Sequence, residues 1–223
     1  MADIYLALDV PTARAAEPLA KQLHAHVGGF KVGGELFLAE GPAICDLLVG
    51  LGANVFVDLK LHDIPRTVEA GAKRLAKLGA SIITVHALGG SEMMKAAVQG
   101  ASVNPKTRVV AVTILTSHND LSELGLPSSI PDQVARLGRL ALASGVHGFV
   151  CSVHEAAALR TLSKDALIVT PGIRMPGGDT HDQKRSASPK EAVQAGANVL
   201  VIGRAVLDAP DRLEALRQVK ASL

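Results

Sequence analysis

The residues best suited to chemistry are two carboxylates and an ammonium group close together in the chain. Asp58 and Lys60 fall in the apolar run 54–60, and Asp63 follows three residues later. Side chains two residues apart on a strand point the same way, so Asp58 and Lys60 are predicted to project together while Leu59 faces the opposite layer. Asp63 is near enough to turn back to this site or to reach a neighbouring subunit. An ammonium group beside carboxylates stays charged, and in a dry site it can deliver a proton to a carbanion.

Two further charged residues, Asp9 and Lys31, belong to other apolar runs nearer the start of the chain. For Asp58 and Lys60 alone, the alternative is a buried ion pair that only specifies packing. So many ionisable groups at one end of a fold exceed what packing requires, and the set favours a catalytic network. Asp58 and Asp63 are also of the residue type that binds Mg²⁺. Because Lys60 between them already supplies positive charge, we expect no metal site.

A glycine and a nearby arginine follow each of the last two apolar runs, as Gly172 with Arg174 and as Gly203 with Arg204. Glycines let backbone N–H groups approach an anion, and an arginine adds charge-assisted hydrogen bonds. Each pair alone is a weak signal. The two together predict a phosphate site.

The segment 174–187 is expected to form a lid over this anion, because it contains a proline and two glycines between the last two apolar runs. Gln183 and Arg185 are its candidate contacts. The alternative is a solvated connector. Of the eight histidines, His62 and His86 lie nearest the proposed site, and we expect each to have a hydrogen-bonding structural role.

A repeating fold must position these residues. Eight short runs are almost wholly apolar, which is typical of parallel strands buried on both faces; they cover 4–9, 30–33, 54–60, 81–87, 109–116, 148–153, 167–173 and 198–204. Apolar residues at helical spacing lie between them. This alternation favours a single (β/α)8 TIM barrel over residues 1–223, with its chemistry at the carboxyl ends of the strands. The alternative, an open doubly wound sheet, wants a glycine-rich turn after 4–9, and none is present.

Helix boundaries are predicted at two places. Pro18 interrupts the first helical stretch, so we expect a loose turn over 12–16 and a regular helix from about Glu17. Ser188 precedes Pro189, and Glu191 stands three residues after the serine. That order predicts a capping box at the start of a helix.

Composition excludes several functional classes. The chain has 48% hydrophobic residues, one Tyr, four Phe and no Trp, with a net charge of +2. So few aromatic residues and so little net charge argue against a nucleic-acid or acidic-membrane partner. Cys45 and Cys151 are expected to be buried and reduced, as in a cytoplasmic protein. We see no secretion signal and no run long enough to span a bilayer.

The longest motif, Asp58-Leu59-Lys60-Leu61-His62-Asp63-Ile64-Pro65-Arg66-Thr67, resembles the signature of the orotidine 5′-phosphate decarboxylase family. The resemblance covers the whole chain, through Leu-Ala-Leu-Asp9, Phe30-Lys31-Val-Gly, Val85-His86-Ala87, Leu-Thr116-Ser117, Pro-Gly-Ile-Arg174, Asp182-Gln183-Lys-Arg and Val-Ile-Gly203-Arg204. One departure is Arg66, where relatives commonly have asparagine. Because it is not one of the charged catalytic positions, we expect it to leave the activity unchanged.

The resemblance implies a cofactor-free decarboxylation of orotidine 5′-monophosphate to UMP, the last step of de novo pyrimidine synthesis. It implies that Lys60 protonates C6 of the pyrimidine, that Asp58 lies near the departing carboxylate, and that Lys31 completes the charge network and touches the ribose. It further implies a ribose contact from Asp9, recognition of the pyrimidine amide edge by Thr116 and Ser117, phosphate contacts from Arg174, Gln183, Gly203 and Arg204, and a homodimer in which Asp63 and Thr67 act across the interface.

Two alternatives remain open. The first is a Mg²⁺-dependent sugar-phosphate decarboxylase or aldolase of the same superfamily, such as 3-keto-gulonate-6-phosphate decarboxylase or hexulose-phosphate synthase. Such enzymes are similar in barrel, charged core and phosphate site, but the segment 62–65 and Gln183 favour the pyrimidine enzyme. The second is a non-catalytic phosphate-binding paralogue. We expect such a paralogue to have lost a charged member of the network, and all are present.

Overall fold

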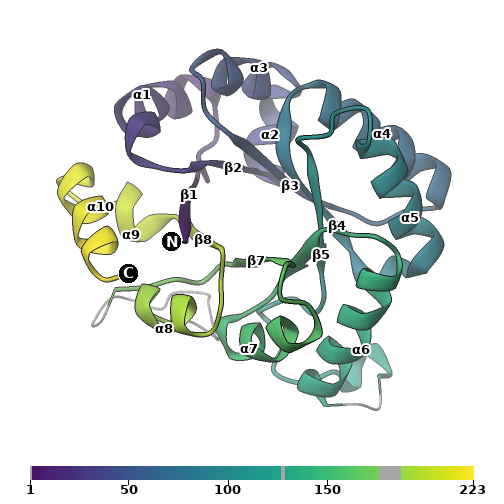
Figure 1. Ribbon diagram of the computed structural model, residues 1–223. Helices are drawn as coiled ribbons and strands as arrows, with labels where there is room; N and C mark the ends of the chain where they lie inside the picture. Colours follow the sequence, from purple (N-terminus) through teal and green to yellow (C-terminus); the bar gives the residue numbers. More distant parts are fainter. Residues whose placement is uncertain (1, 127–128, 176–186) are drawn as a thin grey trace.

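Eight parallel strands close into a barrel in the computed structural model, which describes residues 2–126, 129–175 and 187–223. The strands follow one another in chain order, and β1 pairs with β8 to complete the ring (Figure 1). They are β1 (Asp3–Ala7), β2 (Gly29–Gly33), β3 (Val55–Leu61), β4 (Ala80–His86), β5 (Arg108–Val112), β6 (Gly148–Val150), β7 (Leu167–Thr170) and β8 (Val199–Ile202). The predicted TIM barrel is confirmed.

Each strand begins within one residue of its predicted apolar run, but several strands end early. The first run was expected to continue to Asp9, and β1 ends at Ala7. The fifth run was expected to reach Thr116, and β5 ends at Val112. The apolar pattern continues past the last backbone hydrogen bond between neighbouring strands. Residues beyond that point can be buried at the barrel mouth without pairing with another strand. Asp9, Thr116 and Arg174 therefore lie beyond the ends of their strands, whereas Lys31, Asp58 and Lys60 lie within β2 and β3.

Helices surround the barrel in Figure 1. In the described residues they are α1 (Ala13–Leu23), α2 (Gly34–Glu40), α3 (Ala43–Gly50), α4 (Pro65–Lys77), α5 (Gly90–Ala101), α6 (Ile130–Ala143), α7 (Val153–Leu162), α8 (Pro189–Gln194), α9 (Arg204–Leu207) and α10 (Arg212–Ala221), with single 3₁₀ turns at η1 (His24–His26), η2 (Ala87–Gly89) and η3 (Ser122–Leu124). Within this part of the chain, none of the helices combines the length and the apolar character needed to cross a membrane.

The first helix corrects one prediction. It begins at Ala13 rather than near Glu17, and Pro18 lies inside it. The Thr12 side chain accepts a hydrogen bond from the Ala15 N–H, so a proper N-cap starts the helix before the proline. Pro18 removes the bond to the Arg14 carbonyl, but both residues are exposed and water can replace it.

The boundaries of α8 follow the predicted chemistry. The Ser188 hydroxyl accepts from the Glu191 N–H while the Glu191 carboxylate accepts from the Ser188 N–H, which is a capping box. Pro189 occupies the first turn, where its missing N–H costs nothing. Gly196, just beyond the helix, has a φ of 95°, which an L side chain rarely adopts.

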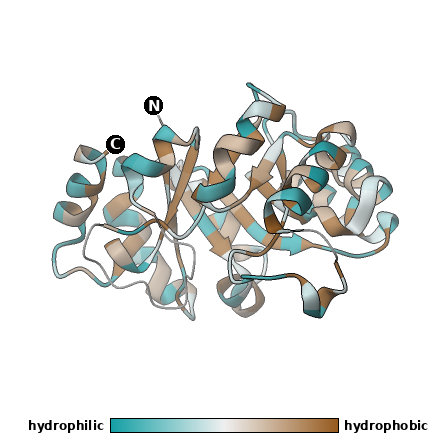
Figure 2. Ribbon diagram, turned by 90° about the horizontal axis from the view of Figure 1, so that it is seen from below, coloured by the Kyte–Doolittle hydropathy of each residue, from teal (hydrophilic) through white to brown (hydrophobic). Residues whose placement is uncertain are grey.

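The core has two parts, separated by the wall of strands. The larger part lies between strands and helices, and its largest side chains include Phe30, Leu36 and Phe149. The smaller part fills the barrel and consists of Tyr5, Ala7, Phe56, Ile82, Val110, Val169, Val199 and Val201. Figure 2 shows mainly hydrophobic strands inside helices of mixed hydropathy. Side chains thus fill the inside of the barrel, as is usual for this fold.

Candidate active site

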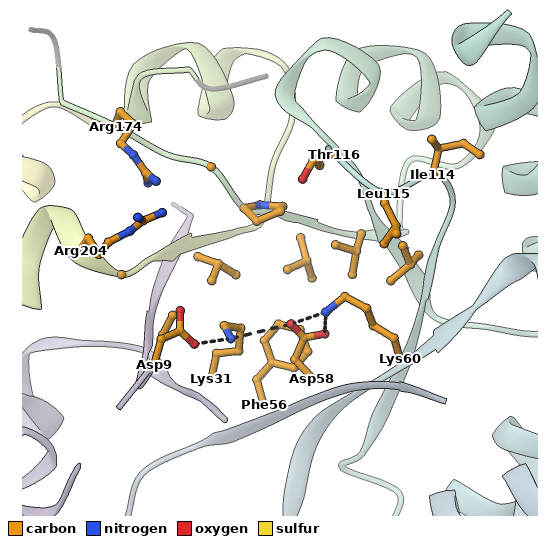
Figure 3. Close-up of a pocket in the computed structure, with 18 residues that line it drawn as sticks. Asp9, Lys31, Phe56, Asp58, Lys60, Ile114, Leu115, Thr116, Arg174 and Arg204 are labelled. Atoms are coloured by element: carbon orange, nitrogen blue, oxygen red, sulfur yellow. Dashed lines mark hydrogen bonds and ion pairs between the residues drawn. The ribbon is translucent and has the colours of Figure 1, made fainter. Parts of the chain in front are cut away.

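A cavity of about 270 Å³ opens at the carboxyl ends of the strands (Figure 3). Among the described residues, every strand or its following loop except β4 contributes to the lining. The lining residues are Ala7, Asp9, Lys31, Phe56, Asp58, Lys60, Val112, Ile114, Leu115, Thr116, Val150, Val169, Pro171, Gly172, Arg174, Val201, Gly203 and Arg204. The structure thus brings together most of the residues that the sequence singled out.

Four of these residues form a chain of alternating charge along one wall. Lys31 Nζ lies 3.1 Å from Asp9 Oδ1 and 3.8 Å from Asp58 Oδ2. Lys60 Nζ lies 3.0 Å from both carboxylate oxygens of Asp58. The side chains of Lys31 and Asp58 are 12% and 14% exposed, and that of Lys60 is 40% exposed. The inner pair is therefore shielded from water, whereas the Lys60 ammonium has a face open to a ligand.

The backbone at the end of β3 explains how Lys60 reaches this position. Lys60 has a φ of 49°, and among the described residues no other residue except glycine has a positive φ. The pairing of β3 with β4 also shifts register between Val57 and Leu61. A bulge re-aims a side chain in this way, and strained backbone of this kind is concentrated at functional sites. Leu59 packs against the outer core, as predicted.

Gly33 provides the space for the Lys31 ammonium. A Cβ atom at Gly33 would lie 3.0 Å from Lys31 Nζ and 3.5 Å from Asp9 Oδ1. The backbone of Gly33 has an ordinary φ of −88°, so conformation alone does not require glycine there. The requirement comes from the lysine, which occupies the place of a side chain.

Two arginines lie at the far end of the cavity from Lys60 (Figure 3). Arg174 follows β7, and Arg204 begins α9 directly after β8. Gly203, before Arg204, also lines the cavity. This end therefore carries the positive charge expected of a phosphate site. Gln183 and Arg185, the predicted lid contacts, lie outside the described residues.

Three predicted residues do not line the cavity of their own chain. Asp63 and Thr67 are exposed at the start of α4, and the Asp63 carboxylate accepts from the Ile64 N–H at 2.6 Å. Between them, Ile64 is 65% exposed although it is large and apolar. Ser117 is also exposed, whereas its neighbour Thr116 lines the cavity.

The two histidines predicted near the site contact each other. The rings of His62 and His86 stack with centroids 5.4 Å apart. His86 Nδ1 accepts a hydrogen bond from the Leu88 N–H at 3.4 Å, in line with the structural role predicted for this residue. Burial lowers the pKa of His86 to about 4, and the nearby His62, Lys60 and His118 add to the effect. His86 is therefore neutral at pH 7.

The apolar floor of the cavity is the part that sequence reasoning missed. Phe56, Val150, Val169 and Val201 line it from four strands. Their signal was the alternation along each strand, since Phe56 is two residues before Asp58 and points the same way. Continuous apolar runs hide which residues face inward, because both faces are buried.

The family comparisons agree with this geometry. A sequence model described as "Orotidine 5'-phosphate decarboxylase / HUMPS family" matches residues 3–219. Proteins named orotidine 5'-phosphate decarboxylase are 51% identical in Anaeromyxobacter sp. (strain K) and 46% identical in Paramagnetospirillum magneticum, and each match covers 99% of this chain and 97% of the relative. A crystal structure of orotidine 5'-phosphate decarboxylase from Lactobacillus acidophilus has a TM-score of 0.88 at 37% identity, covering 100% of this chain and 99% of that one. The chain belongs to the orotidine 5'-phosphate decarboxylase / HUMPS family.

Proposed function

We propose that the protein decarboxylates orotidine 5′-monophosphate to UMP and CO₂, a step of pyrimidine biosynthesis, without a cofactor. The observation that carries this is the Lys60 ammonium, which lies 3.0 Å from both oxygens of Asp58 and is partly open to the cavity. The names of the relatives support the substrate. The cytoplasmic location expected from the sequence stays a prediction.

The reaction needs a positive charge where the carboxylate departs. The bond from C6 to the carboxylate carbon breaks, CO₂ leaves, and the electron pair stays on C6. Lys60 gives a proton to C6 and then takes up a new proton from solvent. Its ammonium stabilises the developing carbanion more than the neutral ground-state carbon, which is how a fixed charge lowers a barrier. Asp58 holds that ammonium in place through both of its carboxylate oxygens, and it lies near the departing carboxylate.

The rest of the cavity holds the nucleotide at a distance from the reacting carbon. Arg174, Gly203 and Arg204 take the phosphate at one end, with Gln183 as a further contact. Asp9 and Lys31 contact the ribose. Thr116, with Ser117, recognises the amide edge of the pyrimidine. Phosphate binding at one end can thus hold the base against Lys60 at the other.

We also propose that the site is completed by a second copy of the chain. Asp63, just before α4, and Thr67, in its first turn, are exposed and lie outside the cavity of their own chain. Ile64, between them, exposes a large apolar side chain that a symmetric partner would cover. In the dimer, Asp63 and Thr67 of each protomer act in the site of its partner.

The first experiment is to follow the ultraviolet absorbance of orotidine 5′-monophosphate with purified protein and EDTA. We expect a steady loss of the orotate chromophore with UMP as the product. An absence of change with folded protein would contradict the proposal. Turnover of 3-keto-gulonate 6-phosphate with Mg²⁺ would then indicate a sugar-phosphate enzyme, and nucleotide binding without turnover would indicate a non-catalytic paralogue. The Asp58 oxygens already contact Lys60 Nζ, which argues against a Mg²⁺ ion on this carboxylate.

A further inference from the structure

Strand β4 supplies no side chain to the described lining of the cavity, yet one of its residues forms hydrogen bonds with the charge network. Val57 of β3 pairs with Ile83, and Leu61 pairs with Val85. Three residues of β3, 58–60, therefore lie opposite the single residue Thr84. The bulge takes these residues out of the regular ladder of backbone hydrogen bonds.

Thr84 fills the gap with its hydroxyl group. The Lys60 N–H donates to Thr84 Oγ1 at 2.8 Å, and Thr84 Oγ1 donates to Asp58 Oδ1 at 3.0 Å. These directions are fixed, because a backbone N–H can only donate and a carboxylate can only accept. Thr84 is 0% exposed, so water cannot take over either bond.

We propose that Thr84 is a positioning residue for the proton donor, an inference that rests on the proposed decarboxylase function. By accepting a hydrogen bond from the Lys60 N–H, the Thr84 hydroxyl holds the Lys60 backbone in a left-handed conformation that lysine otherwise avoids. Its donor turns the Asp58 carboxylate so that both oxygens lie 3.0 Å from Lys60 Nζ. The Thr84 hydroxyl therefore fixes both the backbone of Lys60, the proton donor, and the side chain of Asp58, which orients the Lys60 ammonium. Thr84 itself is fully buried and is not part of the described cavity lining.

The test compares variants that differ at this hydroxyl. Thr84→Val keeps the shape and loses both hydrogen bonds, and Thr84→Ser keeps them. We expect Thr84→Val to lower kcat by about 10- to 100-fold, with KM and the UMP dissociation constant within about threefold of the wild type. Thr84→Ser should stay within about threefold in kcat. The matched control is Thr113→Val, because Thr113 is equally buried and its hydroxyl, within the described part of the chain, hydrogen-bonds to the Val150 carbonyl alone, at 3.5 Å.

A second readout does not depend on activity. We expect NMR to show the Lys60 amide proton exchanging at least about tenfold faster in Thr84→Val than in the wild type and Thr84→Ser. If the wild type does not turn over the nucleotide, the proposed function fails, and amide exchange still decides the role of Thr84. Unchanged exchange and unchanged kcat in Thr84→Val overturn the inference, as does an equal loss of kcat in Thr113→Val. If Thr84→Val does not fold, Thr84→Ala takes its place with the same expected results.

Discussion

At the scale of residues, the position of the Lys60 ammonium depends on its own backbone conformation and on the charged side chains next to it. Lys60 reaches the cavity through a left-handed backbone, and its ammonium lies 3.0 Å from the Asp58 carboxylate. Lys31 lies in space that Gly33 leaves empty. The charged residues could be predicted from the sequence because ionisable groups are rare in buried strands. The left-handed conformation of Lys60 could not, since nothing local favours it in lysine.

Replacing Lys60 should separate catalysis from binding. We expect Lys60→Ala to lower kcat by at least about 10³-fold, because the proton donor and the charge facing the carbanion are both lost. UMP binding should remain measurable by calorimetry, since the phosphate end is untouched. Lys60→Gly should be equally inactive and more stable than Lys60→Ala, because glycine adopts a positive φ without strain. Activity near that of the wild type in either variant would contradict the role of Lys60.

A methyl group at Gly33 should disturb catalysis without disturbing the fold. In Gly33→Ala the new Cβ lies 3.0 Å from Lys31 Nζ, and the flexible end of that lysine moves more easily than backbone. We expect kcat/KM to fall about tenfold while the unfolding free energy stays within about 1 kcal/mol. The matched control is Gly34→Ala, where no atom lies within 4 Å of the new Cβ. A similar fall in both variants would show that the lysine is not the cause.

At the scale of elements, the existence of each strand could be predicted and its end could not. Runs of apolar residues reveal a strand, but its last paired residue depends on where the neighbouring strand stops. β5 ends at Val112 although the apolar pattern runs on to Leu115. The bulge in β3 exists only in its pairing with β4, so no pattern within 54–60 contains it. Local rules also failed at Pro18, where the cap at Thr12 outweighed one lost hydrogen bond.

The ends of β3 and β4 should be sensitive to acid through His86. Burial lowers its pKa to about 4 from an ordinary value near 6.5. Between these values the unfolded chain binds a proton that the folded ring does not, so stability falls as the pH drops from 6.5 to about 4. We expect this to cost about 2 kcal/mol, less than the full shift implies because the ring is partly exposed.

Urea unfolding at pH 7, 6, 5 and 4 measures this loss. The comparison is His86→Asn, whose side-chain oxygen can still accept from the Leu88 N–H without titrating in this range. The variant should lose about 2 kcal/mol less than the wild type between pH 7 and pH 4. Parallel curves for the two proteins would show that His86 does not titrate as described.

At the scale of the whole molecule, barrel closure makes the site. The strands run from residue 3 to residue 202 and close one ring, and we propose that residues 1–223 form a single domain. Closure brings Lys31, Lys60 and Arg204 to one cavity from opposite parts of the sequence. The number of apolar runs predicted this convergence, because parallel strands in a barrel all end at the same face. The partner surface was predicted from the family resemblance and from no periodicity in the chain.

The proposed completion of the site by a second copy predicts that two inactive proteins recover activity when mixed. In a dimer of one Lys60→Ala and one Asp63→Ala chain, the cavity of the Asp63→Ala protomer has its own Lys60 and takes Asp63 from its partner. The other cavity lacks both groups. With random exchange at equal amounts, half of the dimers are hybrids and half of their cavities are complete. We therefore expect about a quarter of the wild-type activity.

The control pairs Lys60→Ala with Asp58→Ala. These residues serve the same cavity within one chain, 3.0 Å apart, so no hybrid contains a complete site and activity should stay at the level of the single variants. Native mass spectrometry follows subunit exchange in both mixtures. If neither mixture recovers activity after full subunit exchange, Asp63 acts in the cavity of its own chain or not at all. Suppose that activity recovers when Lys60→Ala is mixed with Asp63→Ala and does not recover when it is mixed with Asp58→Ala. The Asp63 carboxylate must then reach the site of the partner subunit, because the cavity of the Asp63→Ala chain can obtain this carboxylate only from its partner.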